Sequence, residues 1–214
     1  MNRMFLTIAA LLLFATTAFA ESGKDSGFYG GVDVGYARVE NSTQKIANDF
    51  VNLLGGSVTV VQDVSAPVGR IFAGYTINQN IALELGFVQT GDFNANVSGY
   101  TGGFVPYTVK ETDSASGFEL SAVIRPVTEN GWHRFFVRAG AHNLNISSKL
   151  TSSFPGATAV NLDRSGNGFL IGIGYDTPIS ETLSCRSAYT YYDKIGGESD
   201  NYAHIVTIGL MAKF

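Results

Sequence analysis

Six charged side chains of this sequence stand at alternate positions within segments that are otherwise rich in apolar residues. They are three carboxylates and three guanidinium groups: Asp33, Glu84, Glu119, Arg70, Arg138 and Arg186. If these segments share an interior, opposite charges can pair and hydrogen-bond there, which offsets the cost of taking them out of water. The chemistry that this pattern predicts is therefore an internal ion-pair cluster that plugs the interior.

The three histidines do not stand in a pattern that supports catalysis or metal binding. Hydrolysis by a serine nucleophile needs a histidine beside the serine, but His142 is followed by Asn143-Leu144-Asn145. His133 lies in a turn and His204 near the start of the last apolar segment, so no two histidines share a register that could hold a metal ion. We therefore expect no enzyme, no cofactor and no metal site.

Eight segments that must position these residues alternate between apolar and small or polar residues, which is the period of a half-buried β-strand. In the clearest, Ile81, Leu83, Leu85, Phe87 and Phe93 share one face, whereas Ala82, Glu84, Gly86 and Thr90 share the other. The other seven segments are residues 28–36, 70–77, 118–125, 134–142, 168–176, 183–191 and 204–214. The charged residues of the cluster fall on the face opposite the large apolar side chains.

The lengths of the connections decide between a soluble β-sandwich and a membrane barrel, because the strands of both alternate. Short connections lie at 78–79, 127–133 and 177–181. They alternate along the chain with long connections at 41–66, 94–115, 146–165 and 194–201. Outer-membrane barrels have short inner turns and long outer loops. The sequence therefore predicts an all-β fold, an eight-stranded antiparallel transmembrane up-and-down β-barrel with both termini in the periplasm. Side chains just fill a lumen of eight strands, so we expect no wide channel.

The first 20 residues predict an export signal that is cleaved. Arg3 is followed by an apolar run from Phe5 to Phe14, and Ala18-Phe19-Ala20 supplies the small residues of a cleavage site. The alternative is a transmembrane anchor, which needs about 20 apolar residues, and Thr16-Thr17 interrupt this run. We expect residues 1–20 to be the signal peptide and 21–214 to form one barrel domain in the bacterial outer membrane.

Composition excludes two further classes of protein. Beyond the first 20 residues no apolar run is long enough for a transmembrane helix, which excludes a helical membrane protein. The formal net charge is −4 and no Lys or Arg cluster is present, so a nucleic-acid partner is not expected. Cys185 is the only cysteine, which excludes an intrachain disulfide and leaves a thiol that is either buried or reactive.

The sequence ends in an apolar strand face that carries a phenylalanine at its last position. Phe214, Leu210 and Ile208 alternate on this face. Such an ending is typical of the C-terminal signal by which the barrel-assembly machinery receives outer-membrane proteins. We expect this machinery, outer-membrane lipids and lipopolysaccharide to be the partners of the chain.

The first long connection shows apolar residues at helical spacing. They are Ile46, Phe50, Val51, Leu53 and Leu54, directly before Gly55-Gly56. A helix with this apolar face would either contact a host or neighbouring surface or pack over the mouth of the barrel. Loops on a rigid scaffold carry recognition most often, so 41–66 and 94–115 are the expected sites of binding.

Two stretches of the sequence resemble the transmembrane barrel domain of outer membrane protein A and its small porin-like relatives. They are FAGYTINQNIALELGF at 72–87 and the glycine-rich strand, short Pro-containing turn and Arg186, Tyr189 and Tyr191 of 172–191. The resemblance implies an interior carboxylate–guanidinium pair between Glu84 and Arg186. It also implies two interior charges that this sequence lacks, since Gly174 stands in place of an acid and Ala122 in place of a lysine.

Three classes of function fit these observations. The favoured one is a structural or surface barrel that we expect to be a monomer. It has a side-chain-filled lumen and long extracellular loops for interaction with, or adhesion to, a host or surface ligand. The alternative is a narrow porin-like pore for ions or small solutes. The third is an enzyme that modifies lipid A, for which the sequence lacks a His-x-Ser motif at His142.

Overall fold

The computed structural model describes residues 27–40, 51–52, 56–103, 105–126, 134–153 and 157–214, and these form one antiparallel sheet of ten strands. The strands are β1 (Gly27–Glu40), β2 (Ser57–Gln62), β3 (Ser65–Asn78), β4 (Ile81–Thr90), β5 (Phe93–Tyr100), β6 (Pro106–Ile124), β7 (Phe135–Ser152), β8 (Val160–Pro178), β9 (Leu183–Tyr192) and β10 (Tyr202–Lys213). A short 3-10 helix, η3 (Ile195–Gly197), lies between β9 and β10.

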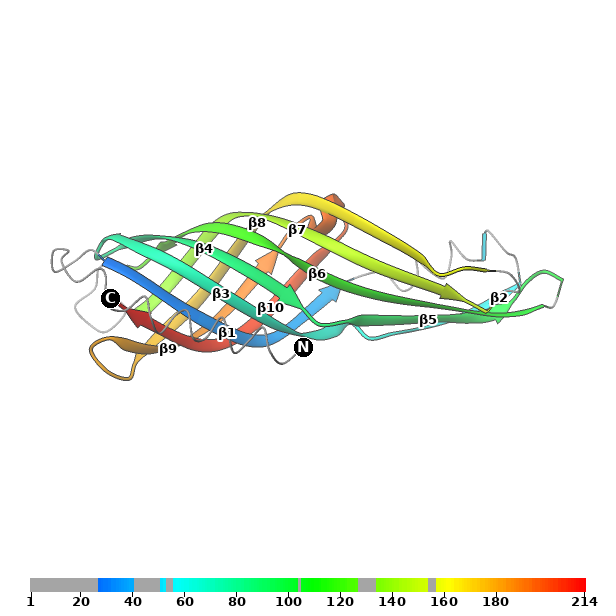
Figure 1. Ribbon diagram of the computed structural model, residues 1–214, viewed down its shortest axis with the longest axis horizontal. Helices are drawn as coiled ribbons and strands as arrows, with labels where there is room; N and C mark the ends of the chain where they lie inside the picture. The colour runs from blue at the N-terminus through cyan, green and yellow to red at the C-terminus, as the bar shows by residue number, and fades with distance from the viewer. Residues whose placement is uncertain (1–26, 41–50, 53–55, 104, 127–133, 154–156) are drawn as a thin grey trace.

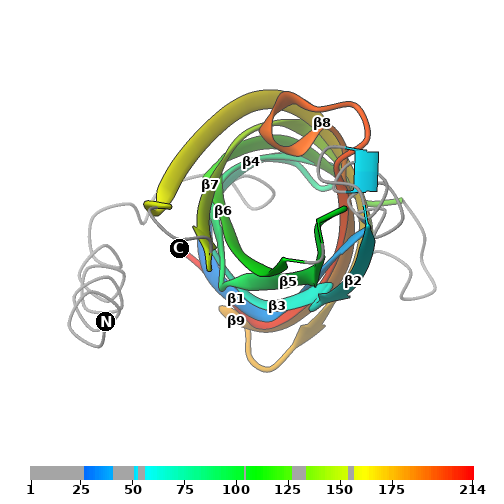
Figure 2. The same ribbon diagram turned by 90° about the vertical axis from the view of Figure 1, so that its right-hand side faces the viewer.

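Eight of the strands close into a ring. Their order is β6-β4-β3-β1-β10-β9-β8-β7, and the pairing of β7 with β6 completes the circle, as the view along the axis shows (Figure 2). Each neighbouring pair in the ring is antiparallel. The structure therefore confirms the predicted all-β, eight-stranded antiparallel barrel.

The two faces of the ring strands differ as the alternation predicts. On β1, Val34 is 62% exposed whereas its neighbour Asp33 is 2% exposed, and on β6 Phe118 is 61% exposed whereas Glu119 is 2% exposed. Apolar side chains on the outside of a closed barrel suit contact with hydrocarbon, and the closed ring leaves no strand edge there. The lumen holds the polar and charged side chains.

The sheet continues beyond one end of the barrel. Here β2 pairs with β5, β5 pairs with the first half of β6, and the outer parts of β7 and β8 remain paired with them (Figure 1). We call this part the extension; it comprises β2, β5, and residues 106–115, 146–152 and 160–168. At the opposite end β1 begins and β10 ends, and β3 and β4 are joined by a tight turn at 79–80 (Figure 1).

The extension corrects the predicted long connections at 41–66, 94–115 and 146–165. Parts of these stretches are strands: β2 occupies 57–62, β5 with the first half of β6 fills most of 94–115, and β7 and β8 extend to Ser152 and from Val160. Burial alternates in β5 and at the start of β6, with Ala95, Val97, Tyr107 and Val109 buried, but residues 111–116 of β6 are all half-buried and show no alternation.

Phe93 is the apolar side chain whose predicted face is wrong. It was expected to face outward with Leu85 and Phe87, but it is 7% exposed and belongs to β5. Gln89 pairs with Ser116 and Phe93 with Asp113, so four steps on one strand match three on β6. One extra residue around Gly91 therefore reverses the faces of everything that follows.

Several predictions fall on residues outside the described ranges. They are the signal peptide at 1–20, the short connection at 127–133 that contains His133 and, apart from Val51 and Asn52, which are helical, the predicted helix of the first connection. No helix in the described ranges has the length and apolar character needed to cross a membrane.

Candidate functional site

The lumen contains a layer of charged side chains that lies between two apolar layers along the barrel axis. Toward the end where β1 begins, the apolar layer contains Tyr29, Phe72, Ala82, Val123, Phe136 and Met211. Toward the extension it contains Ala37, Val68, Val88, Leu144, Leu170, Tyr192 and Ile205. Asp33, Arg70 and Glu84 each lie between members of the two layers on their own strands.

Arg70 on β3 binds three carboxylates at once. Its guanidinium nitrogens lie 3.0 Å from Asp33 Oδ2, 2.8 Å from Glu84 Oε2 and 2.6 Å from Glu119 Oε1. Asp33 is its direct cross-strand partner on β1, whereas the two glutamates reach it from β4 and β6. The guanidinium also lies 4.3 Å from the centroid of the Phe72 ring, an arrangement that favours a cation.

Arg186 on β9 forms the second centre of the layer. Nη1 donates to Glu84 Oε1 at 2.5 Å, and Nε and Nη2 donate to the two carboxylate oxygens of Asp176 at 2.7 and 3.1 Å. Its guanidinium is 4.6 Å from the centroid of the Phe136 ring. Nη2 also lies 3.2 Å from Met211 Sδ, so that β10 contributes to the layer as well.

Arg138 on β7 completes the layer on the side toward the extension. Nη1 donates to Glu119 Oε1 at 3.1 Å, and Nε and Nη2 donate to the Thr190 hydroxyl at 3.1 and 2.8 Å. Tyr192 donates to the other oxygen of Glu119. The layer thus satisfies its buried charges with bidentate and bridging hydrogen bonds, which is the condition under which buried ion pairs are tolerated.

The layer is electrically balanced and spans the whole ring. Arg125, the residue directly after β6, donates to Asp176 Oδ2 at 3.0 Å, so four guanidinium groups face the four carboxylates of Asp33, Glu84, Glu119 and Asp176. Their charges sum to zero. Strands β1, β3, β4, β6, β7, β8 and β9 each supply at least one of these eight residues. An array of this kind crosses the lumen and holds opposite strand walls together.

The structure brings together all six residues of the predicted cluster, and each is at most 5% exposed. Sequence reasoning missed Asp176, Arg125 and the two tyrosine hydroxyls, of Tyr29 and Tyr192, that cap Glu84 and Glu119. The signal that could have found Asp176 is the alternation of its segment, which places it on the lumen face. Its cross-strand partner, Arg186, follows only from the register of β8 and β9.

Gly174 and Ala122 have structural explanations. A Cβ at Gly174 would collide with the ring of Phe136, so the glycine leaves room for that ring and Asp176, one lumen position further along β8, supplies the acid. Ala122 is not an interior position, which corrects the prediction for it: β6 turns Ser121 inward, where it pairs with Glu84 in register, and Ala122 outward.

His142 and His204, the histidines within the described ranges, make contacts that bring neither of them to a serine hydroxyl or to a group of metal ligands. His142 Nε2 lies 2.7 Å from the carbonyl oxygen of Asp193, and His204 Nδ1 lies 2.5 Å from the Tyr189 hydroxyl on the outside of the barrel. Within the described ranges no three His, Cys, Asp or Glu residues are grouped so that they could hold a metal ion. Cys185 is partly exposed on the outward face of β9.

The alternation, the closed ring and the buried charge layer together describe an outer-membrane barrel, and comparison with known families agrees. The sequence profile of the outer membrane protein beta-barrel domain matches residues 6–214. The chain belongs to this family. It is therefore an outer membrane β-barrel protein of the bacterial outer membrane, and the apolar outer face of its ring lies against lipid.

Comparison with solved structures finds similar outer membrane proteins. Ail of Yersinia pestis covers 88% of this outer membrane barrel and 99% of its own chain at 14% identity, with a TM-score of 0.51. OprG of Pseudomonas aeruginosa covers 90% and 98% at 14% identity and a TM-score of 0.47. Neisserial surface protein A covers 89% and 100% at 16% identity and a TM-score of 0.46. No curated protein matches the sequence.

The predicted C-terminal assembly residues lie on the lipid face of this outer membrane barrel. Ile208 is 57% and Leu210 is 48% exposed, and the amide nitrogen of Phe214 donates to the carbonyl oxygen of Phe28 at 2.9 Å. The last residue therefore continues the pairing of β10 with β1 at the seam of the barrel. Its part in assembly stays a prediction.

Proposed function

We propose that this outer membrane barrel is a structural and surface-interaction protein that binds its partner through the extension while its lumen stays closed. The observation that carries the proposal is the combination of a charge layer that fills the lumen and a sheet that continues beyond the bilayer-spanning ring. In this proposal both termini lie in the periplasm, the extension lies outside the cell, and the protein acts as a monomer. Assembly machinery and lipopolysaccharide remain its proposed partners in the membrane.

The edge of β8 is the feature of the extension that fits a binding role. Residues 160–165 pair with β7 on one side, and β9 joins β8 only from Leu170, so within the described ranges no strand covers their other side. All six are exposed, including Val160 and Leu162 at 48% and 41%. An exposed edge offers backbone donors and acceptors to an added strand of a partner.

A closed lumen supports this proposal over a narrow pore. Side chains of Arg70, Glu84 and Arg186 are at most 3% exposed, and their bonds join opposite walls. A conducting path would need these bonds to open. Lipid A modification is not supported either, because His142 is bound to a backbone carbonyl and not to a serine hydroxyl.

The experiment is retention of bacteria that display the protein on wells coated with extracellular-matrix proteins, with uncoated wells as the baseline. The double variant Val160→Lys/Leu162→Lys places charges on the β8 edge, which opposes strand addition. We expect it to lose retention. Val105→Lys is the control, since Val105 is 51% exposed in the connection between β5 and β6 and lies outside β8. Equal retention by all three proteins would refute the proposed edge. Slower migration of boiled samples on a gel verifies that each variant has folded.

A further inference from the structure

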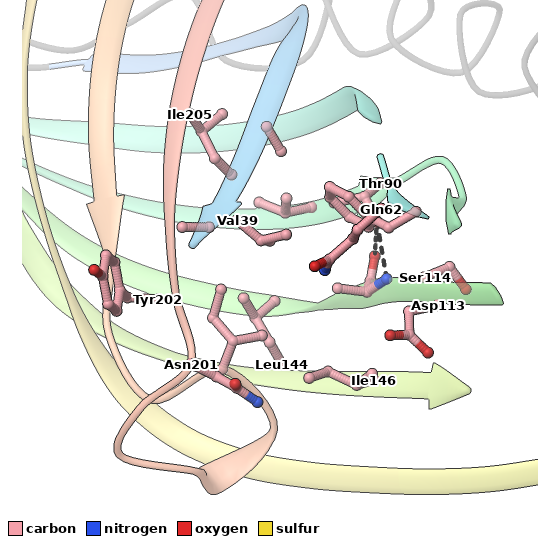
Figure 3. A pocket seen from close by; sticks show the side chains of 16 residues that line it. Val39, Gln62, Thr90, Asp113, Ser114, Leu144, Ile146, Asn201, Tyr202 and Ile205 are labelled. Atoms are coloured by element: carbon pink, nitrogen blue, oxygen red, sulfur yellow. Dashed lines mark hydrogen bonds between the residues drawn. The ribbon is translucent and has the colours of Figure 1, made fainter. Parts of the chain in front are cut away.

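Two basic residues face outward at the extension end of the ring. Figure 3 shows Val39 of β1 and Ile205 of β10 in the wall of a cavity inside that end of the barrel. Because side chains alternate along a strand, the residues before them, Arg38 and His204, point to the outside. Arg38 is exposed and His204 is partly exposed, and the register of β1 and β10 places the two directly opposite each other.

The outward side chains of β1 change in character toward this pair. Phe28 and Val34 are apolar, the exposed Tyr36 comes next on the same face, and Arg38 follows it. At roughly 3.3 Å per residue and a strand tilt of about 40°, Phe28 and Arg38 are roughly 25 Å apart along the membrane normal. That is the height of the apolar band of an outer-membrane barrel, so Arg38 and His204 lie at the level of the lipid headgroups.

Three tyrosines fix the position of the His204 ring. Its centroid lies 5.9 Å from that of Tyr189, 5.5 Å from that of Tyr191 and 5.8 Å from that of Tyr202. The Tyr189 hydroxyl also lies 2.5 Å from Nδ1 of the histidine. A hydroxyl that donates to Nδ1 leaves the ring proton on Nε2. The histidine therefore presents an N–H donor, Nε2, next to the guanidinium group of Arg38.

The charge of Arg38 is not balanced by a carboxylate of the described ranges. It forms no ion pair there, unlike the four arginines of the charge layer. Asp193 is the acidic residue at the edge of this patch, and its Oδ1 already accepts a hydrogen bond from the Tyr191 hydroxyl at 3.4 Å. Basic groups directly opposite each other in a sheet repel when both are charged, and an anion between them removes that cost. A guanidinium fork beside an N–H donor matches the oxygen atoms of a phosphate group.

We infer that Arg38 and His204 form a binding site for a phosphate group of lipopolysaccharide, with the rings of Tyr189 and Tyr191 beside it. The inference rests on the proposed function for its orientation, in which the extension lies outside the cell, and it gives the proposed lipid partner a place on the barrel. A phosphate held by both residues bridges β1 and β10, the first and last strands, where the ring closes. The site is separate from the β8 edge.

The test is a titration of the folded barrel in detergent with lipid A, and with the same lipid lacking its phosphate groups, followed by native mass spectrometry. We expect lipid A to bind about tenfold or more tightly than the dephosphorylated lipid, because hydrogen bonds between charged groups are the strong ones. Equal affinities would mean that the acyl chains alone hold the lipid, and would overturn the inference.

Three variants locate the site. Arg38→Gln removes the guanidinium group and should weaken the binding of lipid A about tenfold, with no effect on the dephosphorylated lipid. His204→Phe keeps a ring among the tyrosines but removes the donor, and should weaken lipid A by a smaller factor. The control is Arg134→Gln, which removes an exposed arginine just before β7, at the opposite end of the ring, and should leave the affinity unchanged.

Two results with the variants would overturn the inference. One is a loss of affinity in Arg134→Gln that equals the loss in Arg38→Gln, because any arginine at the rim would then serve. The other is unchanged affinity for lipid A in both Arg38→Gln and His204→Phe when each protein is folded. Arg38→Gln should leave the retention of bacteria on coated wells unchanged, so that a failure of this site and a failure of the β8 edge are distinguishable.

Discussion

Arg186 and Glu84 lie 102 residues apart in the sequence, yet Nη1 of the arginine is 2.5 Å from Oε1 of the glutamate in the centre of the lumen. The other oxygen of Glu84 accepts a bond from Arg70 at 2.8 Å, so one carboxylate is shared by two guanidinium groups from β3 and β9. The charge layer thus connects opposite walls of the barrel through Glu84.

Removing the carboxylate from Glu84 should destabilise the barrel strongly. Glu84→Leu leaves Arg70 and Arg186 buried with one acceptor fewer, and breaking a buried pair in this way costs about 3–5 kcal/mol. Denaturant unfolding in lipid vesicles, followed by gel migration, measures the change. The double variant Glu84→Leu/Arg186→Met should recover part of the loss, because it removes both charges together. A double variant that is as unstable as the sum of both single changes would contradict the pairing.

Gly174 should tolerate no side chain. Gly174→Ala would bring a Cβ against the Phe136 ring and the carbonyl oxygen of Ser187, and overpacking of this kind costs about 1–3 kcal/mol. Gly69→Ala is the control, because a Cβ at Gly69 meets no atom within 4 Å. The same unfolding assay separates them: equal stability of the two variants would show that Gly174 does not make room for Phe136.

The extension should become more stable as the pH falls. Burial and the neighbouring Asp113 raise the pKa of Glu111 above its ordinary value of 4.5, and burial also raises the pKa of Asp113 above 3.8. The folded extension therefore binds protons more tightly than the unfolded chain, so stability is gained as the pH falls from neutral through these raised values. The nearby Arg164 opposes the shift of both groups without reversing it.

Amide hydrogen exchange of β5 and β6, expressed as protection factors, tests this pH dependence. Protection in the extension should rise between about pH 7 and pH 5 while that of the ring strands stays unchanged. Glu111→Gln should raise protection at neutral pH and weaken its dependence on pH. A fall in protection on acidification would contradict the assignment.

The ring could be predicted from the sequence because its outer face meets lipid, which forces a strict alternation such as that of Leu83, Glu84 and Leu85. The extension lies beyond that constraint. Its faces at Glu111 and Asp113 are half-buried and polar, so alternation there was weak and the strands were assigned to connections. Phe93 was misplaced because a single extra residue in the ladder leaves no mark in the sequence.

The sequence predicts six of the charged residues of the layer, but it does not predict the bonds between them. Alternation places Arg70 and Glu119 on the inner face, but the 2.6 Å contact between them crosses from β3 to β6, which are not neighbours in the ring. Such contacts depend on the stagger of the strands and on the space left by glycines such as Gly86, where a Cβ would crowd the Glu119 side chain. Asp176 joins the layer through its register with Arg186 on the neighbouring β9, and Tyr192 joins it through a hydroxyl bond to Glu119 on β6.

We propose that the charge layer closes the lumen of this outer membrane barrel. Conductance of the purified protein in a planar lipid bilayer tests it most directly, with Glu84→Ala/Arg186→Ala as the variant that removes the pair at the centre. We expect no steady openings for the wild-type protein and measurable conductance only when the layer is interrupted. Regular ohmic steps from the folded wild-type protein would contradict it and would establish a narrow pore.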